Sequence, residues 1–283
     1  MRRFIAALVV GALLLTCPIR AQSRVSSVPY LVTTTWLADH FEDAKVVLLW
    51  TGFMPPEGAL IPRTRVVPHA SLMAMQNGQH ELAATNDFEV ALRNAGVSDE
   101  SHMVIYGEPM AAGWLFFALD YFGHNRASML DGGVEKWRAE GRQTGMPLTA
   151  VARGAFTTSI RTGLKATADD VQRAVGEKVV VLDARSAKEY EAGHIPGAKL
   201  LPWVGLYADQ KLGIMKTRDE LSALFQSAGA VPGAKVVTYC QIGLRSSVLY
   251  FAARYAGFDV RNYVGSWTDW TSKGLASEPA QVR

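Results

Sequence analysis

The chain has 283 residues, of which 49% are hydrophobic and 19% are charged, a balance that excludes a disordered protein and indicates a substantial core. Its length is sufficient for two ordinary domains. The net charge of +3 comes from three arginines within the first 20 residues, so the rest of the chain is balanced and gives no electrostatic basis for binding nucleic acid.

The N-terminal stretch MRRFIAALVVGALLLTCPIRAQS has the pattern of a targeting signal. Two arginines precede an apolar run over residues 4–16, which is too short for a membrane span, and Ala21 offers a small residue for cleavage. We expect residues 1–21 to be removed as a signal peptide and the mature protein to be periplasmic, without membrane attachment. The alternative is a buried N-terminal helix. A threonine precedes Cys17, which fits a lipid-anchor site poorly, and cleavage would leave Cys240 without a partner for an internal disulfide.

Two halves of the chain repeat the same landmarks in the same order. VVLLWTG, GALIPRTRVVP, MVIYGEP and MLDGGVEKW in the first half correspond to VVVLDARS, AGHIPGAKLLP, VVTYCQIG and NYVGSWTDW in the second. The spacing is nearly constant, since Tyr239 follows Tyr106, and Trp270 follows Trp137, by the same interval. This regularity indicates a duplicated domain of about 120 residues. We assign residues 28–145 to the first domain, 146–164 to a linker and 165–278 to the second domain.

Each half alternates β-branched runs with helix-like runs, which predicts an α/β sheet with helices on both faces. In the second half, residues 178–182 and 235–239 are apolar on both faces, as buried parallel strands are. Thr167 is a suitable N-cap for a helix that starts near Ala168, and residues 246–255 predict a second helix. The linker has little periodicity, with one extended segment expected near Phe156.

A short loop, Cys240–Arg245, connects the strand at residues 235–239 to the helix predicted from Ser246. Ligands of open α/β sheets bind beyond the carboxyl ends of the strands. Several backbone N–H groups of such a turn, and the positive end of the helix, would stabilise negative charge on the sulfur. Gly243 allows the curl, and Arg245 is suited to contact an oxyanion. The loop predicts an anion cradle around a nucleophile; the alternative is a buried cysteine beside a solvated arginine.

The second half, with VLDARSAKEYEAGHIPGAKLLPW, YCQIGLRSS and YVGSWTDW, resembles the rhodanese domain of sulfurtransferases. The resemblance extends over residues 31–270 and implies two tandem rhodanese-like domains, each a mainly parallel sheet with helices on both faces, as in thiosulfate and mercaptopyruvate sulfurtransferases. In the first half, Gly107 stands in the place of Cys240, Trp50 in that of Asp183, and GALIPRT in that of GHIPGA. The resemblance therefore implies an inactive first domain and a catalytic second one.

The resemblance also implies sulfur transfer in two steps. The thiolate of Cys240 attacks the outer sulfur of a small donor and keeps it as a persulfide, and a thiophilic acceptor such as cyanide or a thiol then removes it. Gln241, Ile242, Gly243 and Leu244 would surround the substrate. Backbone amides stabilise both anions, so neither a metal nor an organic cofactor is expected. We expect a monomer. The loop CQIGLR carries its own arginine, which favours thiosulfate as the donor over 3-mercaptopyruvate.

Two arginines are candidates for binding the charged end of the donor. Arg245 is the first, and Arg185, also at a strand's carboxyl end, is the second; a surface or interdomain salt bridge is an equal alternative for Arg185. We expect Asp183 to orient the loop or Arg185 rather than to act as a base. Several further residues are given structural roles in turns, in packing or on a helix face: His124, His194, Trp267, Trp270, Glu189 and Tyr190.

Two other functions remain possible from the sequence. Tyrosine phosphatases carry one residue more between cysteine and arginine than the four found here, so a phosphatase or arsenate reductase is disfavoured. A persulfide carrier or redox module that does not turn over small donors is the remaining alternative.

Overall fold

The computed structural model of the protein describes residues 28–174 and 179–279. The predicted signal peptide, residues 1–21, and Cys17 lie outside that part of the chain. Within it, no helix combines the length and apolar character needed to cross a bilayer.

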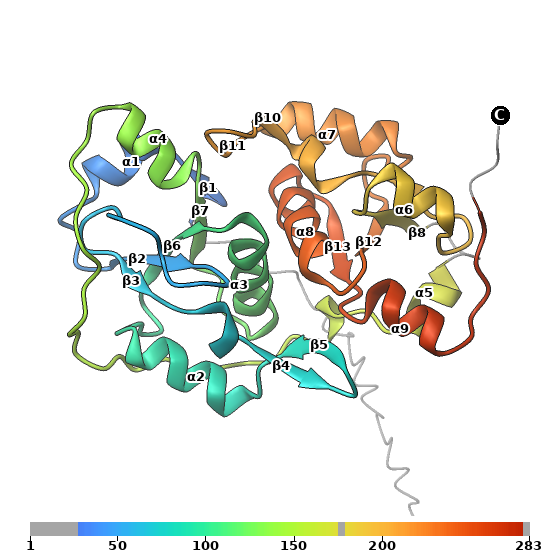
Figure 1. The fold of residues 1–283 in the computed structure, drawn as a ribbon, viewed down its shortest axis with the longest axis horizontal. Helices are drawn as coiled ribbons and strands as arrows, with labels where there is room; N and C mark the ends of the chain where they lie inside the picture. Colours follow the sequence, from blue (N-terminus) through green and yellow to red (C-terminus); the bar gives the residue numbers. More distant parts are fainter. Residues whose placement is uncertain (1–27, 175–178, 280–283) are drawn as a thin grey trace, which may run out of the picture.

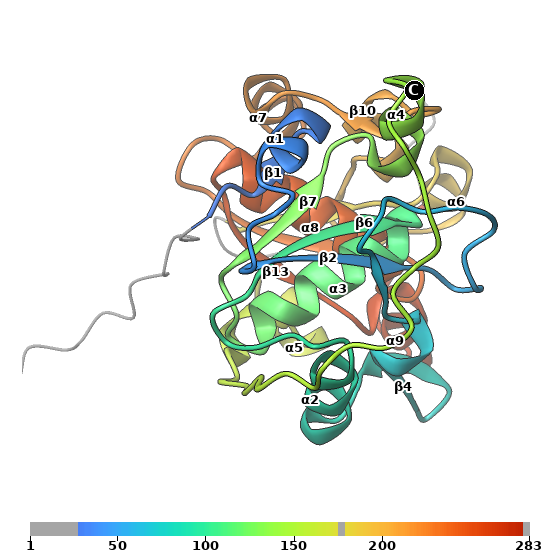
Figure 2. The same ribbon diagram turned by 90° about the vertical axis from the view of Figure 1, so that its left-hand side faces the viewer.

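The first domain is built on a sheet of parallel strands in the order β1-β7-β6-β2-β3. Figure 2 faces this domain and shows β7, β6 and β2 side by side. The strands are β1 (Leu31–Val32), β2 (Val46–Thr51), β3 (Arg65–Val66), β6 (His102–Gly107) and β7 (Ala127–Leu130). A separate antiparallel hairpin consists of β4 (Met73–Gln76) and β5 (Gln79–Leu82).

The second domain has a sheet of parallel strands in the order β13-β12-β8-β9. Its strands are β8 (Val179–Asp183), β9 (Lys199–Leu200), β12 (Lys235–Tyr239) and β13 (Asp259–Asn262). A second antiparallel hairpin consists of β10 (Tyr207–Asp209) and β11 (Ile214–Met215). The two sheets confirm the predicted α/β fold of two parallel-sheet domains.

Helices cover both faces of each sheet. In the first domain, α2 and α3 pack on one face and α1 and α4 on the other; in the second, α7 and α8 oppose α5 and α9. The helices of the first domain are α1 (Thr34–Asp39), α2 (Thr85–Asn94), α3 (Pro109–Tyr121) and α4 (Gly133–Ala139). Those of the second are α5 (Ala168–Ala174), α6 (Ala187–Ala192), α7 (Arg218–Ser227), α8 (Leu244–Ala256) and α9 (Ser266–Ser272). Short 3-10 turns are η1 (His69–Ser71), η2 (Thr162–Leu164) and η3 (Trp203–Leu206).

The central strands are apolar throughout because both of their faces are covered. Along β2, Val47 and Leu49 pack into the core beneath α3, while Leu48 and Trp50 pack beneath α4. In β12, Val236 belongs to the core shared with the first domain and Val237 to the opposite one. Successive side chains of a strand point to opposite faces, so these runs fill two cores at once.

Matching hydrogen bonds confirm that the halves are structural repeats. The hydroxyl of Tyr106 accepts from the backbone N–H of Ile61 at 3.2 Å, and that of Tyr239 accepts from Ile195 at 3.2 Å. Both bonds tie the central strand to the Ile-Pro turn of the same domain, which explains why that tyrosine recurs in both halves.

Helices α3 and α8 lie side by side at the centre of the molecule and form the main contact between the domains (Figure 1). A methyl carbon added to Gly113 of α3 would lie 2.9 Å from the backbone nitrogen of Val248 in α8, so the helices can approach this closely only at glycine. Further along, the rings of Phe117 and Tyr250 meet edge to face with centroids 5.0 Å apart. The two domains therefore share one hydrophobic core.

Each domain also extends its hairpin onto the other. Glu81 of β5 forms an ion pair with Lys165 at the start of the second domain. Reciprocally, the backbone N–H of Met215 in β11 donates to Asp131 of the first domain at 2.9 Å. The hairpin of each repeat therefore contacts the other repeat, so the two contacts are equivalent.

Several local predictions can be compared with the elements observed. Thr167 caps α5, since its hydroxyl accepts from the N–H of Asp170 at 3.2 Å, as predicted. Strand β8 extends to Asp183, one residue beyond the predicted end, and helix α8 begins at Leu244 rather than at Ser246. The earlier start places Arg245 in the first turn of the helix instead of in the loop.

The predicted linker packs along the first domain and forms no strand near Phe156. Phe156 is fully buried against Phe88 and His124, and the N–H of Arg161 donates to the carbonyl of Tyr121 at 2.7 Å. Isolated side-chain burial and single backbone bonds therefore fix this segment, which explains its lack of periodicity. The predicted domain limits, 28–145, 146–164 and 165–278, stay predictions.

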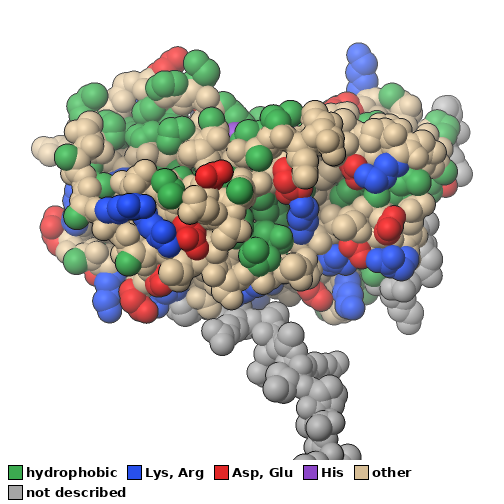
Figure 3. Space-filling model, turned by 90° about the horizontal axis from the view of Figure 1, so that it is seen from below, with side chains coloured by type: hydrophobic (Ala, Val, Ile, Leu, Met, Phe, Trp, Pro, Cys, Tyr) green, Lys and Arg blue, Asp and Glu red, His purple; other side chains and the backbone are tan. Residues whose placement is uncertain are grey.

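Charged side chains are mixed over the face seen in Figure 3, where acidic and basic groups alternate around an apolar centre. This face carries no continuous patch of one sign.

Candidate active site

Cys240 lies directly beyond the carboxyl end of β12, an interior strand of the second sheet, as predicted. Its Sγ accepts a hydrogen bond from the backbone N–H of Gly243 at 3.1 Å, at the N-terminal end of the 13-residue helix α8. The amide of Cys240 itself is directed elsewhere, to the hydroxyl of Ser266 at 3.1 Å. Of the several backbone N–H groups predicted to face the sulfur, the structure directs that of Gly243 at Sγ, while the Cys240 amide anchors the loop.

Gly243 is required at its position for two reasons. Its φ is +89°, in the left-handed region that side chains disfavour, and a methyl carbon there would lie 2.6 Å from the carbonyl oxygen of Val264. The predicted role of Gly243 in curling the loop agrees with this conformation. Ser246, one turn into the helix, donates its hydroxyl proton back to the Gly243 carbonyl at 3.0 Å and stabilises the turn.

Arg245 is held in a forked contact with Glu189 of α6. Its two terminal nitrogens each lie 2.7 Å from a carboxylate oxygen of Glu189. This contact lowers the pKa of Glu189 to about 2, and the interactions with Glu189 and with the neighbouring Cys240 raise the pKa of Arg245. Glu189 also caps its own helix through Ser186. The predicted donor-binding cation is thus near the sulfur, but its charge is shared with a carboxylate that the sequence assigned only to a helix face.

Arg185 is buried in a second ion pair, 2% exposed, with Asp183 fully buried beside it. Its Nη2 donates to Asp183 at 2.7 Å and to the carbonyl of Gly193 at 2.7 Å, and its guanidinium stacks over Trp267 at 4.7 Å. Burial opposes the charge, but the Asp183 carboxylate raises the pKa of Arg185. Asp183 orients Arg185, as predicted. The salt bridge is neither at the surface nor between domains, and a donor-binding role for Arg185 stays a prediction.

The other loop residues divide by exposure. Gln241 and Ile242 are partly exposed, whereas Gly243 and Leu244 are buried, so the first pair is available to a substrate. Gln241 is fixed by Thr268 of α9, whose N–H donates to the Gln241 carbonyl at 3.1 Å. Helix α9 therefore supports the loop from the second domain.

Three of the residues given structural roles, namely His194, Trp270 and His124, lie in turns or in packed interiors. His194 stacks on Tyr190 and its Nδ1 lies 3.0 Å from the Tyr190 carbonyl, holding the turn of GHIPGA. Trp270 is buried, and its indole N–H donates to the carbonyl of Ala276 at 2.8 Å. His124 is buried beside the carbonyl of Ser101.

Cys240 has no exposed surface, so a donor reaches the sulfur only when side chains that cover it move. The first domain reaches the turn of this loop through Trp114 of α3, whose ring would lie 3.3 Å from a methyl carbon on Gly243. Sequence patterns could not assign Trp114 to the site, because its position depends on how α3 packs against α8.

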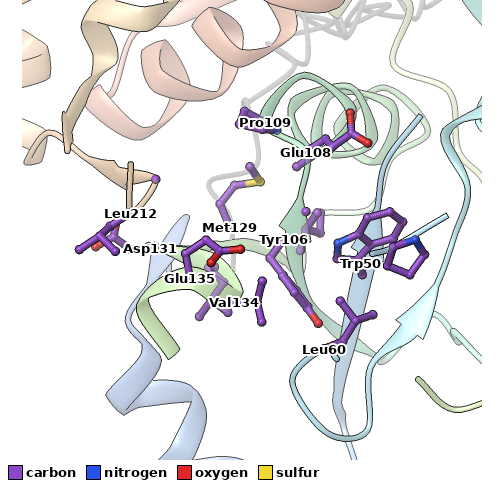
Figure 4. Close-up of a pocket in the computed structure, with 18 of the residues that line it drawn as sticks. Trp50, Leu60, Tyr106, Glu108, Pro109, Met129, Asp131, Val134, Glu135 and Leu212 are labelled. Carbon is purple, nitrogen blue, oxygen red and sulfur yellow. The ribbon is translucent and has the colours of Figure 1, made fainter. Parts of the chain in front are cut away.

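The first domain has a cavity of about 550 Å³ where the second has its cysteine loop. Gly107 lies at the end of β6, and Trp50 and Tyr106 line one side of the space, opposite Leu212 of the second domain's hairpin (Figure 4). No cysteine is among the residues that line the cavity, and the inactivity of this domain stays a prediction. Nor do residues 28–174 and 179–279 contain a cluster of three or more His, Cys, Asp or Glu able to hold a metal ion.

The fold and the site together define a protein of two similar parallel-sheet domains, with a cysteine in an anion cradle only in the second. Comparison with known proteins identifies the family to which this two-domain protein belongs. A family model, the Rhodanese-like domain, matches residues 167–273. The chain is 30% identical over 270 residues to the "Sulfur carrier protein TtuD" of Thermus thermophilus, a match that covers 85% of this chain and 93% of that protein.

Other relatives are named as enzymes. The chain is 30% identical to the "Putative thiosulfate sulfurtransferase SseA" of Mycobacterium tuberculosis over 85% of this chain and 87% of that protein. It is 26% identical to the "3-mercaptopyruvate sulfurtransferase" of Escherichia coli over 90% and 100% of the respective chains. The crystal structure of SseA from Escherichia coli matches with a TM-score of 0.75 at 26% identity, covering 85% of this chain and 99% of that one. The chain belongs to the rhodanese family of sulfurtransferases, in its two-domain form.

Proposed function

We propose that the protein transfers the sulfane sulfur of thiosulfate, through a persulfide on Cys240, to cyanide or a thiol. In the first step the Cys240 thiolate attacks the outer sulfur of thiosulfate; the S–S bond of the donor breaks, sulfite leaves with the electron pair, and a persulfide anion remains. In the second step the acceptor attacks the terminal sulfur and releases the Cys240 thiolate. Charge and sulfur balance in each step without an external oxidant or reductant.

The observation that carries this proposal is the N–H of Gly243 directed at Cys240 Sγ from the start of α8. A preorganised amide and the positive end of a helix favour the anionic states of the cycle, the thiolate and the persulfide. The backbone supplies this stabilisation, so it needs no side chain that changes its protonation state during the cycle.

Donor choice is supported by the cation nearest the sulfur. Arg245 lies within electrostatic reach of Cys240, which favours an anionic donor. The ion pair of Arg245 with Glu189 reduces the net positive charge beside Cys240. For this reason 3-mercaptopyruvate, which carries less negative charge than thiosulfate, is the second candidate donor.

Thiocyanate formation from cyanide tests the proposal directly, with thiosulfate and 3-mercaptopyruvate supplied in parallel and Cys240→Ser as the matched variant. We expect turnover with thiosulfate that is absent in Cys240→Ser. Turnover with 3-mercaptopyruvate alone would refute the donor and leave the two-step mechanism. Equal turnover by wild type and variant would refute the mechanism.

A persulfide carrier is a second candidate function, because Cys240 is fully buried and one relative is named a sulfur carrier protein. A carrier would form the persulfide once and retain it until a partner protein arrives. Rapid loading from thiosulfate, followed by transfer to cyanide that is too slow for repeated turnover, would favour this function over an enzyme of small molecules.

A further inference from the structure

Both arginines predicted to bind the donor are occupied by carboxylates. Arg245 is bound through two nitrogens to Glu189, and Arg185 is buried against Asp183. Each pair is formally neutral, so the carboxylates reduce the positive charge that these guanidinium groups offer to an anionic ligand. A further hydrogen-bond donor near the loop would strengthen the binding of an anionic sulfur donor.

His69 of the first domain lies close to that loop. Its ring packs edge to face against Phe53, with centroids 4.7 Å apart, and against Trp114, with centroids 5.7 Å apart. Trp114 in turn approaches Gly243, whose amide binds the catalytic sulfur. One indole ring therefore separates His69 from the turn that holds Cys240.

The backbone fixes His69 in this place. It follows Pro68 and begins the turn η1, and its N–H donates to the carbonyl of Gly52, just beyond β2, at 3.0 Å. Phe53, which follows Gly52, is 39% exposed. The contacting rings of Trp114, His69 and Phe53 therefore extend from the interior of the protein to its surface. The imidazole thus lies in the part of the first domain that packs, through Trp114, against the turn at Gly243.

The imidazole is 4% exposed, yet neither of its nitrogens has a hydrogen-bond partner among the described residues. Other buried histidines are paired: His102 with the hydroxyl of Ser128 at 2.7 Å, and His124 with the carbonyl of Ser101 at 3.2 Å. Buried polar groups are normally satisfied, and an exception in a native fold calls for a functional explanation. Burial and the neighbouring His80 lower the pKa of His69 to about 4, so the ring is neutral at pH 7 and offers one N–H donor.

We propose that the N–H of His69 binds an anionic oxygen of the sulfur donor, a sulfonate or carboxylate oxygen, while its sulfur is presented to Cys240. This inference rests on the proposed function and gives the first domain, which lacks a nucleophile, a part in donor recognition. The hydrogen bond from His69 acts only in the first half-reaction, in which the sulfur donor is bound. The acceptor reacts with the persulfide after the anionic leaving group has departed.

The test compares His69→Phe, which keeps an aromatic ring and removes the N–H, with His69→Gln, which retains an amide N–H. In a two-step exchange, kcat/KM for the donor and for the acceptor report separate half-reactions. We expect His69→Phe to lower kcat/KM for thiosulfate at least tenfold with little change for cyanide, and His69→Gln to recover a large part of the loss. His124→Phe, another buried histidine of the first domain, is the matched control and should leave both values unchanged.

Binding of thiosulfate to Cys240→Ser, with and without His69→Phe, gives a readout that needs no turnover. We expect at least tenfold weaker binding in the double variant. Equal binding, or equal losses in the donor and acceptor half-reactions, would overturn the role of His69 while wild-type turnover keeps the proposed function. If thiosulfate and 3-mercaptopyruvate neither bind nor turn over, the proposal for His69 and the proposed function both fail.

Discussion

Replacement of Gly243 by alanine tests the cradle most sharply. The left-handed conformation costs a side chain about 1–2 kcal/mol. The new methyl would also lie 2.6 Å from the carbonyl oxygen of Val264, which is backbone, and such overpacking adds about 1–3 kcal/mol. Gly233, at the other end of β12, is the matched control, since its φ is +83° but no atom lies within 4 Å of an added methyl. Only the first cost applies there.

We therefore expect Gly243→Ala to lower the free energy of unfolding by about 2–5 kcal/mol, against about 1–2 kcal/mol for Gly233→Ala. Urea denaturation measures both. Displacing the Gly243 amide also removes a hydrogen bond to the sulfur anion, about 1.5–3 kcal/mol or roughly ten- to 150-fold in the rate of persulfide formation. Gly233→Ala should keep the wild-type rate. If Gly243→Ala matched Gly233→Ala in stability and in rate, the cradle would not be set by this turn.

Three further substitutions test contacts around the site. Asp183→Asn leaves Arg185 buried without its counter-charge, so we expect a loss of about 3–5 kcal/mol in urea denaturation, and an unchanged midpoint would be contrary to the ion pair. Glu189→Gln should lower stability at pH 7: Arg245 lowers the pKa of Glu189 to about 2, so the pair stabilises the fold above about pH 4.5 and is lost as the pH falls toward 2. The variant should therefore lose less stability than wild type over that range, and parallel pH profiles would count against the pair. Gly113→Ala should force α3 and α8 apart, lower the free energy of unfolding by about 1–3 kcal/mol and so lower the melting temperature. An unchanged melting temperature would mean that the helices are not in close contact.

Much of this architecture could be predicted because it depends on local patterns in the sequence. The duplicated landmarks gave two domains, and apolar runs gave the interior strands β8 and β12 to within one residue. The position of Cys240 after a buried strand was sufficient to place it at the functional edge of the sheet. Gly243 could be assigned because a positive φ leaves few alternatives to glycine.

The remainder depends on contacts between distant segments. Glu189 and Arg245 are 56 residues apart, and although the capping pattern Ser186–Glu189 could have placed this carboxylate at the same edge of the sheet, no local pattern pairs it with Arg245. The buried state of Arg185 follows from its stacking on Trp267, in a helix far along the chain.

Contributions from the first domain were hidden for a related reason. His69 approaches the cysteine loop because it contacts Trp114 of α3, and α3 packs against α8. The sequence of the first half shows Gly107 in the place of Cys240, but it does not show which residues this domain brings to the neighbouring cysteine loop.

Formation of a persulfide on Cys240 is the most direct test of the account as a whole. The intact protein is mixed with one equivalent of thiosulfate and its mass is measured before and after cyanide is added, with Cys240→Ser treated in the same way. We expect the wild type to gain the mass of a single sulfur atom, localised to the peptide containing Cys240 and removed by cyanide, while the variant is unchanged. A folded wild-type protein that acquires no sulfur from thiosulfate or from 3-mercaptopyruvate would contradict the central claim.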